Sequence, residues 1–121
     1  MPTRKACVLC RGCPESRIDA NRVKNFLIEN DWTITDNVEE ADLLLFRACG
    51  LTTIDIDNSI QVIIKLKAEI KRNAQFIVWG CLPKINIKAL RSVYTGIAFG
   101  EDEVDILDKI LEAKKSIATV T

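Results

Sequence analysis

The 121-residue sequence contains no histidine. This absence excludes Ser-His and Cys-His nucleophile pairs, the most common general base, and every zinc site that uses an imidazole ligand. No apolar run approaches the roughly 20 residues that a membrane-spanning helix needs. No apolar segment with a cleavage site follows the charged N-terminus either. These absences predict a cytoplasmic protein that does not enter a membrane.

The sequence also lacks net charge, because 17 Lys and Arg balance 17 Asp and Glu. A balanced chain has no polybasic arm of the kind that binds nucleic acids by neutralising phosphates. Its 48% hydrophobic and 28% charged residues are typical of an ordinary globular protein. No repeat, low-complexity tract or Gly/Ser/Pro-rich linker divides the chain. Residues 1–121 are therefore predicted to form a single domain.

Short apolar strands alternate with amphipathic helices along the chain. The clearest strands are Leu43–Phe46 and Phe76–Trp79, which are apolar on both faces, as buried parallel strands are. The other predicted strands cover residues 5–9, 32–35 and 96–100, and the predicted helices cover 14–30, 56–72, 85–91 and 104–111. This alternation predicts a three-layer α/β domain of the flavodoxin-like or Rossmann-like class, with about five mostly parallel strands.

The chain has five cysteines, Cys7, Cys10, Cys13, Cys49 and Cys81. An odd number in a reducing compartment indicates metal-binding or reactive thiols rather than a disulfide framework. Cys13, Cys49 and Cys81 each follow a predicted strand, so a parallel sheet would bring them to its carboxyl edge, where ligands bind in such folds. Three widely spaced thiolates favour a [4Fe-4S] cluster with one open iron over a closed four-ligand zinc site.

The first two cysteines have a different interpretation. Cys7 is expected to be a small buried hydrophobe within the first strand. Cys10 is an additional candidate ligand, because residues 7–13 have the C-x2-C-x2-C spacing familiar from ferredoxins. Residues three apart on a strand point to opposite faces, so Cys7 and Cys10 should not chelate together. Two alternatives stay open: a zinc or thiol-metal module with Cys7 or Cys10 as fourth ligand, and a flavodoxin-like interaction module whose cysteines only pack.

Three motifs surround Cys13, Cys49 and Cys81: Gly12-Cys13-x-x-Ser16-x-x-Asp19, Ala41-Asp42-Leu43-Leu44-Leu45-x-x-x-Cys49 and Val78-Trp79-Gly80-Cys81. Together they resemble the N-terminal domain of the radical-SAM methylthiotransferases, enzymes that modify tRNA adenosines or a ribosomal protein aspartate. The resemblance covers residues 5–115. It implies that Cys13, Cys49 and Cys81 hold an auxiliary [4Fe-4S] cluster, whose open iron binds the sulfur species to be transferred.

Several positions depart from the pattern of that family. Ser16 and Ala20 stand where the family usually has Asn and Ser, and Arg47-Ala48 replaces the usual Asn-Thr before the second cysteine. Arg47 would bring a positive charge near the cluster or pair with a substrate carboxylate. A strand-end arginine that reaches solvent is the plainer interpretation. Together with Arg47, Ser16 and Asp19 form the candidate environment of the cluster or substrate.

The sequence has no C-x3-C-x2-C motif, which binds the cluster that cleaves S-adenosylmethionine in the catalytic domain of this family. We therefore expect no radical-SAM domain in this chain and no complete catalyst. The resemblance implies that S-adenosylmethionine acts only through a partner protein or domain, and that the substrate is tRNA or a ribosomal protein or peptide. If the substrate is RNA, contacts are expected at two basic groups, Lys65, Lys67, Lys71 and Arg72, and Lys84, Lys88 and Arg91. The alternative is that these residues only form the solvated faces of helices.

Overall fold

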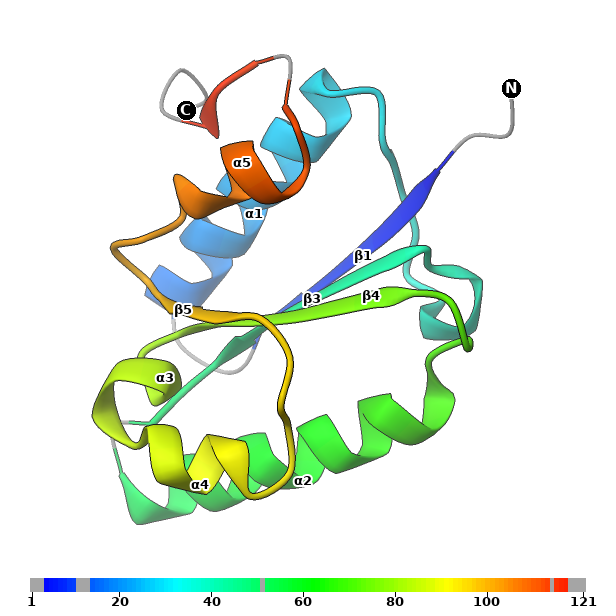
Figure 1. The fold of residues 1–121 in the computed structure, drawn as a ribbon. Helices are drawn as coiled ribbons and strands as arrows, with labels where there is room; N and C mark the ends of the chain where they lie inside the picture. The colour runs from blue at the N-terminus through cyan, green and yellow to red at the C-terminus, as the bar shows by residue number, and fades with distance from the viewer. Residues whose placement is uncertain (1–3, 11–13, 51, 114, 118–121) are drawn as a thin grey trace.

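One parallel sheet organises the protein (Figure 1). The computed structural model describes residues 4–10, 14–50, 52–113 and 115–117, with the backbone alone at residues 14–16. Its strands are β1 (Lys5–Cys10), β2 (Thr33–Ile34), β3 (Leu43–Ala48), β4 (Gln75–Gly80) and β5 (Ala98–Gly100). They pair in the order β2-β1-β3-β4-β5, and every pairing is parallel. This is the flavodoxin-like order, so the predicted fold class is confirmed.

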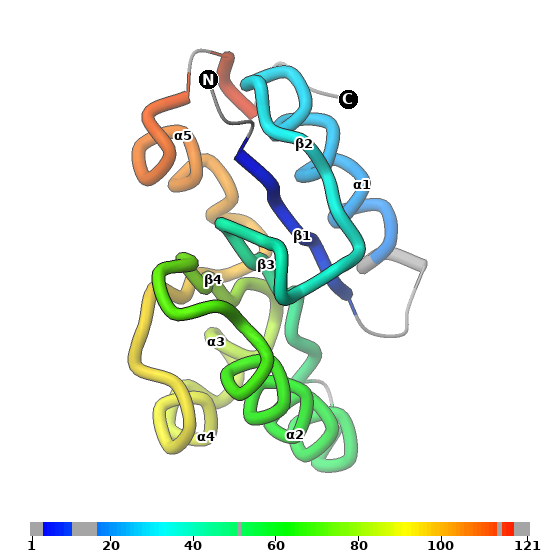
Figure 2. The backbone as a smooth tube through the Cα atoms, turned by 90° about the vertical axis from the view of Figure 1, so that its right-hand side faces the viewer, coloured from blue at the N-terminus to red at the C-terminus, as the bar shows by residue number. Residues whose placement is uncertain are grey.

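Helices cover both faces of the sheet. They are α1 (Pro14–Glu29), α2 (Thr53–Glu69), α3 (Leu82–Ile85), α4 (Ile87–Arg91) and α5 (Ile106–Ile110), with a 3-10 turn, η1, at Val38–Glu40. Figures 1 and 2 show α1 and α5 on one side of the sheet, and α2 and α4 on the other. Right-handed crossovers between parallel strands produce this three-layer arrangement.

The central strand β3 supplies side chains to both layers. Leu43 and Leu45 belong to the core beneath α1 and α5, whereas Leu44 and Phe46 belong to the core beneath α2 and α4. All four side chains are at most 1% exposed. Because helices cover both faces, a continuous apolar run is required here, and a strand with one polar face would leave polar groups buried.

Local capping shifts several predicted boundaries. Helix α2 begins three residues earlier than predicted, because the hydroxyl of Thr52 accepts a hydrogen bond from the backbone N–H of Asp55 at 3.0 Å. The predicted helix over 85–91 is divided at Asn86, whose side-chain oxygen accepts from the N–H of Ala89 and starts α4 separately. The strands predicted at 32–35 and 96–100 are real but shorter.

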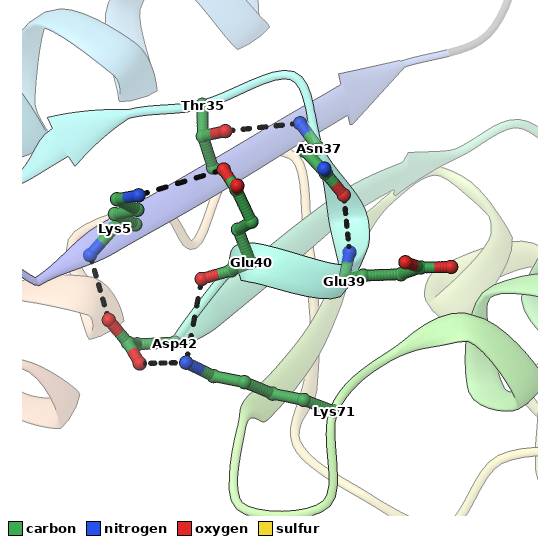
Figure 3. A network of polar contacts seen from close by, with 7 residues as sticks. All are labelled: Lys5, Thr35, Asn37, Glu39, Glu40, Asp42 and Lys71. Atoms are coloured by element: carbon green, nitrogen blue, oxygen red, sulfur yellow. Dashed lines mark hydrogen bonds and ion pairs between the residues drawn. The ribbon is translucent and has the colours of Figure 1, made fainter.

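A polar network fixes the amino ends of β1 and β3, at the edge opposite the cysteine-bearing ends (Figure 3). The carboxylate of Asp42 accepts from the backbone N–H of Lys5 at 2.9 Å and pairs with the ammonium of Lys71. The Lys71 hydrogen bond, followed by that of Lys5, holds the pKa of Asp42 below its ordinary value. The charged side chains of Asp42 and Lys71 therefore anchor the amino ends of these strands.

Candidate functional site

Cys49 and Cys81 lie side by side at the carboxyl edge of the sheet. Ala48 ends β3 and pairs with Gly80, which ends β4, so each cysteine directly follows a paired residue. The backbone N–H of Gly50 donates a hydrogen bond to Sγ of Cys81 at 3.1 Å. The same sulfur lies 3.8 Å from the carbonyl oxygen of Ala48. The loop that carries one cysteine thus directly contacts the thiol of the other.

Helix α2 holds the Cys49 turn in place through Ser59. This fully buried hydroxyl accepts from the N–H of Cys49 at 3.1 Å and donates to the carbonyl oxygen of Cys49 at 2.8 Å. Sequence reasoning missed Ser59. A signal was present, because Ser59 interrupts the apolar stripe that contains Ile56, Ile60 and Ile63, and a polar residue on a buried stripe needs a partner.

Two glycines allow the loops to approach each other. Gly80 has a φ of 121°, and a Cβ built there would lie 2.6 Å from the carbonyl oxygen of Ala48. A Cβ on Gly50 would lie 2.9 Å from Cα of Leu82. Contacts this short exclude a side chain, and the left-handed φ of Gly80 disfavours any L-residue. The glycine beside each cysteine is therefore part of the site.

The third predicted ligand, Cys13, lies outside the described residues, as does the side chain of Ser16. Within the described part of the chain, no group of three Cys, Asp or Glu side chains is arranged to hold a metal ion. Cys49 and Cys81 supply two soft sulfur donors, and the backbone N–H of Gly50 donates to one of them. This donor set suits a thiolate-bound metal centre that takes its remaining ligands from elsewhere.

Cys7 and Cys10 occupy opposite faces of β1, as predicted. Cys7 is fully buried in the core beneath α2, and burial raises the pKa of its thiol. Cys10 is half-buried and contacts the core beneath α1. A buried neutral thiol is a poor ligand and a poor nucleophile, so Cys7 acts as a small hydrophobe.

Arg47 is almost fully enclosed, so the plainer of its two interpretations, a strand-end arginine that reaches solvent, is wrong. Its side chain is 4% exposed, because β3 is the central strand. Nε donates to Oδ2 of Asp19 at 3.0 Å, and Nη2 donates to Oε2 of Glu101 at 2.5 Å. These three residues, with Ile18 and Asp102, line a cavity of about 360 Å³. Sequence reasoning named Asp19 but missed Glu101, 54 residues from Arg47.

Several cations of the two predicted basic groups have partners within the protein. Ion pairs join Lys65 to Glu69, Lys71 to Asp42 and Lys84 to Glu103. The ammonium of Lys67 donates to the carbonyl oxygen of Val93 at 2.6 Å, and Arg91 donates to the carbonyl oxygen of Gly96, also at 2.6 Å. Lys67 and Arg72 line a second cavity, of about 370 Å³, beside Tyr94. Five of these seven basic residues therefore make contacts within the protein that the sequence does not reveal.

Comparison with known proteins identifies the family of this chain. The model of a family described as "Uncharacterized protein family UPF0004" matches residues 5–100, which include all five cysteines. The chain belongs to this family. Its curated relatives identify the family as the N-terminal domain of the methylthiotransferases, so the resemblance seen in the sequence is confirmed.

Three relatives of this methylthiotransferase N-terminal domain illustrate the match. The tRNA-2-methylthio-N(6)-dimethylallyladenosine synthase of Cellvibrio japonicus is 29% identical over 98% of this chain and 27% of its own length. The ribosomal protein uS12 methylthiotransferase RimO of Desulforamulus reducens is 31% identical over 88% of this chain and 26% of its own. RimO of Protochlamydia amoebophila is 26% identical over 87% of this chain and 22% of its own length. The chain thus spans about a quarter of the length of these relatives.

None of the helices in the described ranges is both long enough and apolar enough to cross a membrane.

Proposed function

We propose that this methylthiotransferase-like domain binds an auxiliary [4Fe-4S] cluster through Cys13, Cys49 and Cys81. The observation that carries the proposal is the contact between the Gly50 N–H and Sγ of Cys81, which joins two of the three cysteines at the ligand-binding edge of a flavodoxin-like sheet. Cys13 falls between Cys10, which ends the neighbouring strand β1, and Pro14, which begins α1. The proposal therefore expects the third thiol at the same edge.

The residues of the chain have separate tasks in this proposal. The three thiolates ligate iron, and the Gly50 N–H donates to a ligand sulfur, which tunes the electron density of the centre. Ser59 fixes the backbone of Cys49, and Gly80 lets the carbonyl of Ala48 approach. A cluster with three protein ligands supplies one iron that is open to a sulfur-containing ligand.

The relatives suggest the wider system in which this domain works. We propose that it acts with a radical-SAM domain or protein that supplies S-adenosylmethionine chemistry, on tRNA or on a ribosomal protein or peptide. The choice of these two substrates follows the activities of the Cellvibrio and Desulforamulus relatives. The chain alone is proposed to bind the sulfur-carrying centre, without completing the transfer.

Anaerobic reconstitution with iron and sulfide, followed by metal and acid-labile sulfide analysis, tests the proposal. We expect about four irons and four sulfides per chain. Single Cys13→Ala, Cys49→Ala and Cys81→Ala variants should each lose the stable cluster. Cys7→Ala is the matched control, because Cys7 is buried in the α2 core and should leave the iron content unchanged.

Other results would contradict the assignment in distinct ways. A Cys49→Ala protein with full iron and sulfide would remove Cys49 from the ligand set. One zinc per chain without sulfide, lost in Cys10→Ala, would establish the zinc alternative. A chain that binds no metal after reconstitution would leave an interaction domain whose cysteines only pack.

A further inference from the structure

The Arg47 ion triad connects three separate segments of the cysteine-bearing edge. Asp19 lies in the second turn of α1, Arg47 lies near the end of β3, and Glu101 directly follows β5. Both carboxylates contact the same guanidinium, at 3.0 Å and 2.5 Å. A guanidinium holds its donors in one rigid plane, so two carboxylates on it have a fixed separation. The triad therefore fixes the start of α1 and the end of β5 relative to β3.

Arg47 also occupies a central position among the cysteines. It precedes Cys49 by two residues and pairs across the sheet with Cys10, which precedes Cys13 by three. On the other side its Cγ lies 3.1 Å from the position of a Cβ on Gly80, the residue before Cys81. Arg47 thus lies on the strand that leads to Cys49, between the strands that lead to Cys13 and Cys81.

The charge of the triad is not balanced. One guanidinium and two carboxylates carry a net charge of minus one, and Asp102 lines the same cavity. With 4% exposure, the Arg47 side chain is little screened by water, whereas Asp19 and Glu101 are 36% and 52% exposed. The field of an enclosed charge is weakly screened, so loss of a charge here should change the local potential. Loss of the cation should make the potential more negative, and loss of either anion should make it more positive.

We propose that Arg47 is a positioning residue for the three-cysteine site, which it organises through Asp19 and Glu101 while setting the local electrostatic potential with its enclosed charge. The inference rests on the cluster proposed above. It assigns to Arg47 a role within the protein rather than contact with a substrate carboxylate, since two carboxylates of the chain already bind the guanidinium.

The test compares Arg47→Gln with Asp19→Asn and Glu101→Gln, which remove charges of opposite sign from the same triad. After anaerobic reconstitution, iron and sulfide are counted and the midpoint potential of the cluster is measured. Arg47→Gln should lower the potential and both carboxylate variants should raise it. The expected shifts are up to about tenfold in the one-electron reduction equilibrium, or about 59 mV. Arg47→Lys, which keeps the charge, should restore the wild-type potential but only part of the iron content.

If Arg47 had a purely structural role, the variants would change the stability of the protein without shifting the midpoint potential in opposite directions. Equal potentials in all three variants, or shifts in one direction, would overturn the electrostatic part of the inference. The positioning part is read from amide hydrogen exchange of the metal-free chain. Arg47→Gln should speed exchange in the second turn of α1 and at residues 101–103, and unchanged exchange there would overturn it. A wild-type chain that binds no iron refutes the proposed function and the electrostatic part, whereas the exchange experiment still decides the positioning part.

Discussion

Replacement of Gly80 by alanine should destabilise the protein and disrupt the cysteine edge. The added Cβ would lie 2.6 Å from the carbonyl oxygen of Ala48 and 3.1 Å from Cγ of Arg47, at a φ of 121°. Backbone strain in such a region costs about 1–3 kcal/mol. Overpacking adds about 1–3 kcal/mol. The reduced entropy of the unfolded chain returns about 0.4–1 kcal/mol. With values near the middle of each range, we expect the free energy of unfolding to fall by roughly 2–4 kcal/mol.

Gly100→Ala is the matched control, because Gly100 pairs with Gly80 in the neighbouring strand. The three atoms nearest to a Cβ on Gly100 belong to side chains, Cε and Cγ of Lys84 at 2.5 and 2.8 Å and Oδ1 of Asp102 at 2.9 Å, and side chains can move away more readily than the backbone carbonyl that Gly80 faces. Urea denaturation of both variants gives the comparison. With a slope of about 2 kcal/mol per molar urea, Gly80→Ala should lower the midpoint by about 1–2 M. Gly100→Ala should change it much less, and equal midpoints for the two variants would refute the reasoning.

Two further predictions concern buried hydroxyl groups. Ser59→Ala removes both hydrogen bonds to Cys49 and should lower the free energy of unfolding by about 1–3 kcal/mol in urea denaturation. The exposed Ser92→Ala should change it by no more than about 0.5 kcal/mol, and the idea fails if the two variants match. Burial raises the pKa of Tyr94, the only tyrosine, to about 12. Its neutral form is favoured in the folded state, so stability should decline as the pH rises from about 10 toward 12. Phenolate absorbance of the folded chain should titrate near that upper value, Tyr94→Phe should reduce the decline, and a midpoint near 10 would contradict this assignment.

Much of the fold could be predicted from local pattern. The two-sided apolar runs at 43–46 and 76–79 are central parallel strands, because only a strand covered on both faces needs apolar residues at every position. The alternation of strands and helices, together with right-handed crossovers, then restricts the topology to a few arrangements. Boundaries were less predictable. The caps at Thr52 and Asn86 depend on hydrogen bonds whose geometry residue type alone does not determine.

Part of the candidate site could also be predicted. Cys49 and Cys81 follow strands in sequence, and a parallel sheet must place such positions at one edge. The sequence alone therefore determined the fold class, the family resemblance and the candidate ligands. Only the tertiary structure decided that Arg47 is enclosed by Asp19 and Glu101, that Ser59 holds Cys49, and that Gly50 donates to the thiol of Cys81. The physical reason is the separation of these residues along the chain. Hydrophobic periodicity repeats within a few residues, whereas these contacts join residues 10 to 54 positions apart. Only the packing of the sheet and helices sets the distance between such residues.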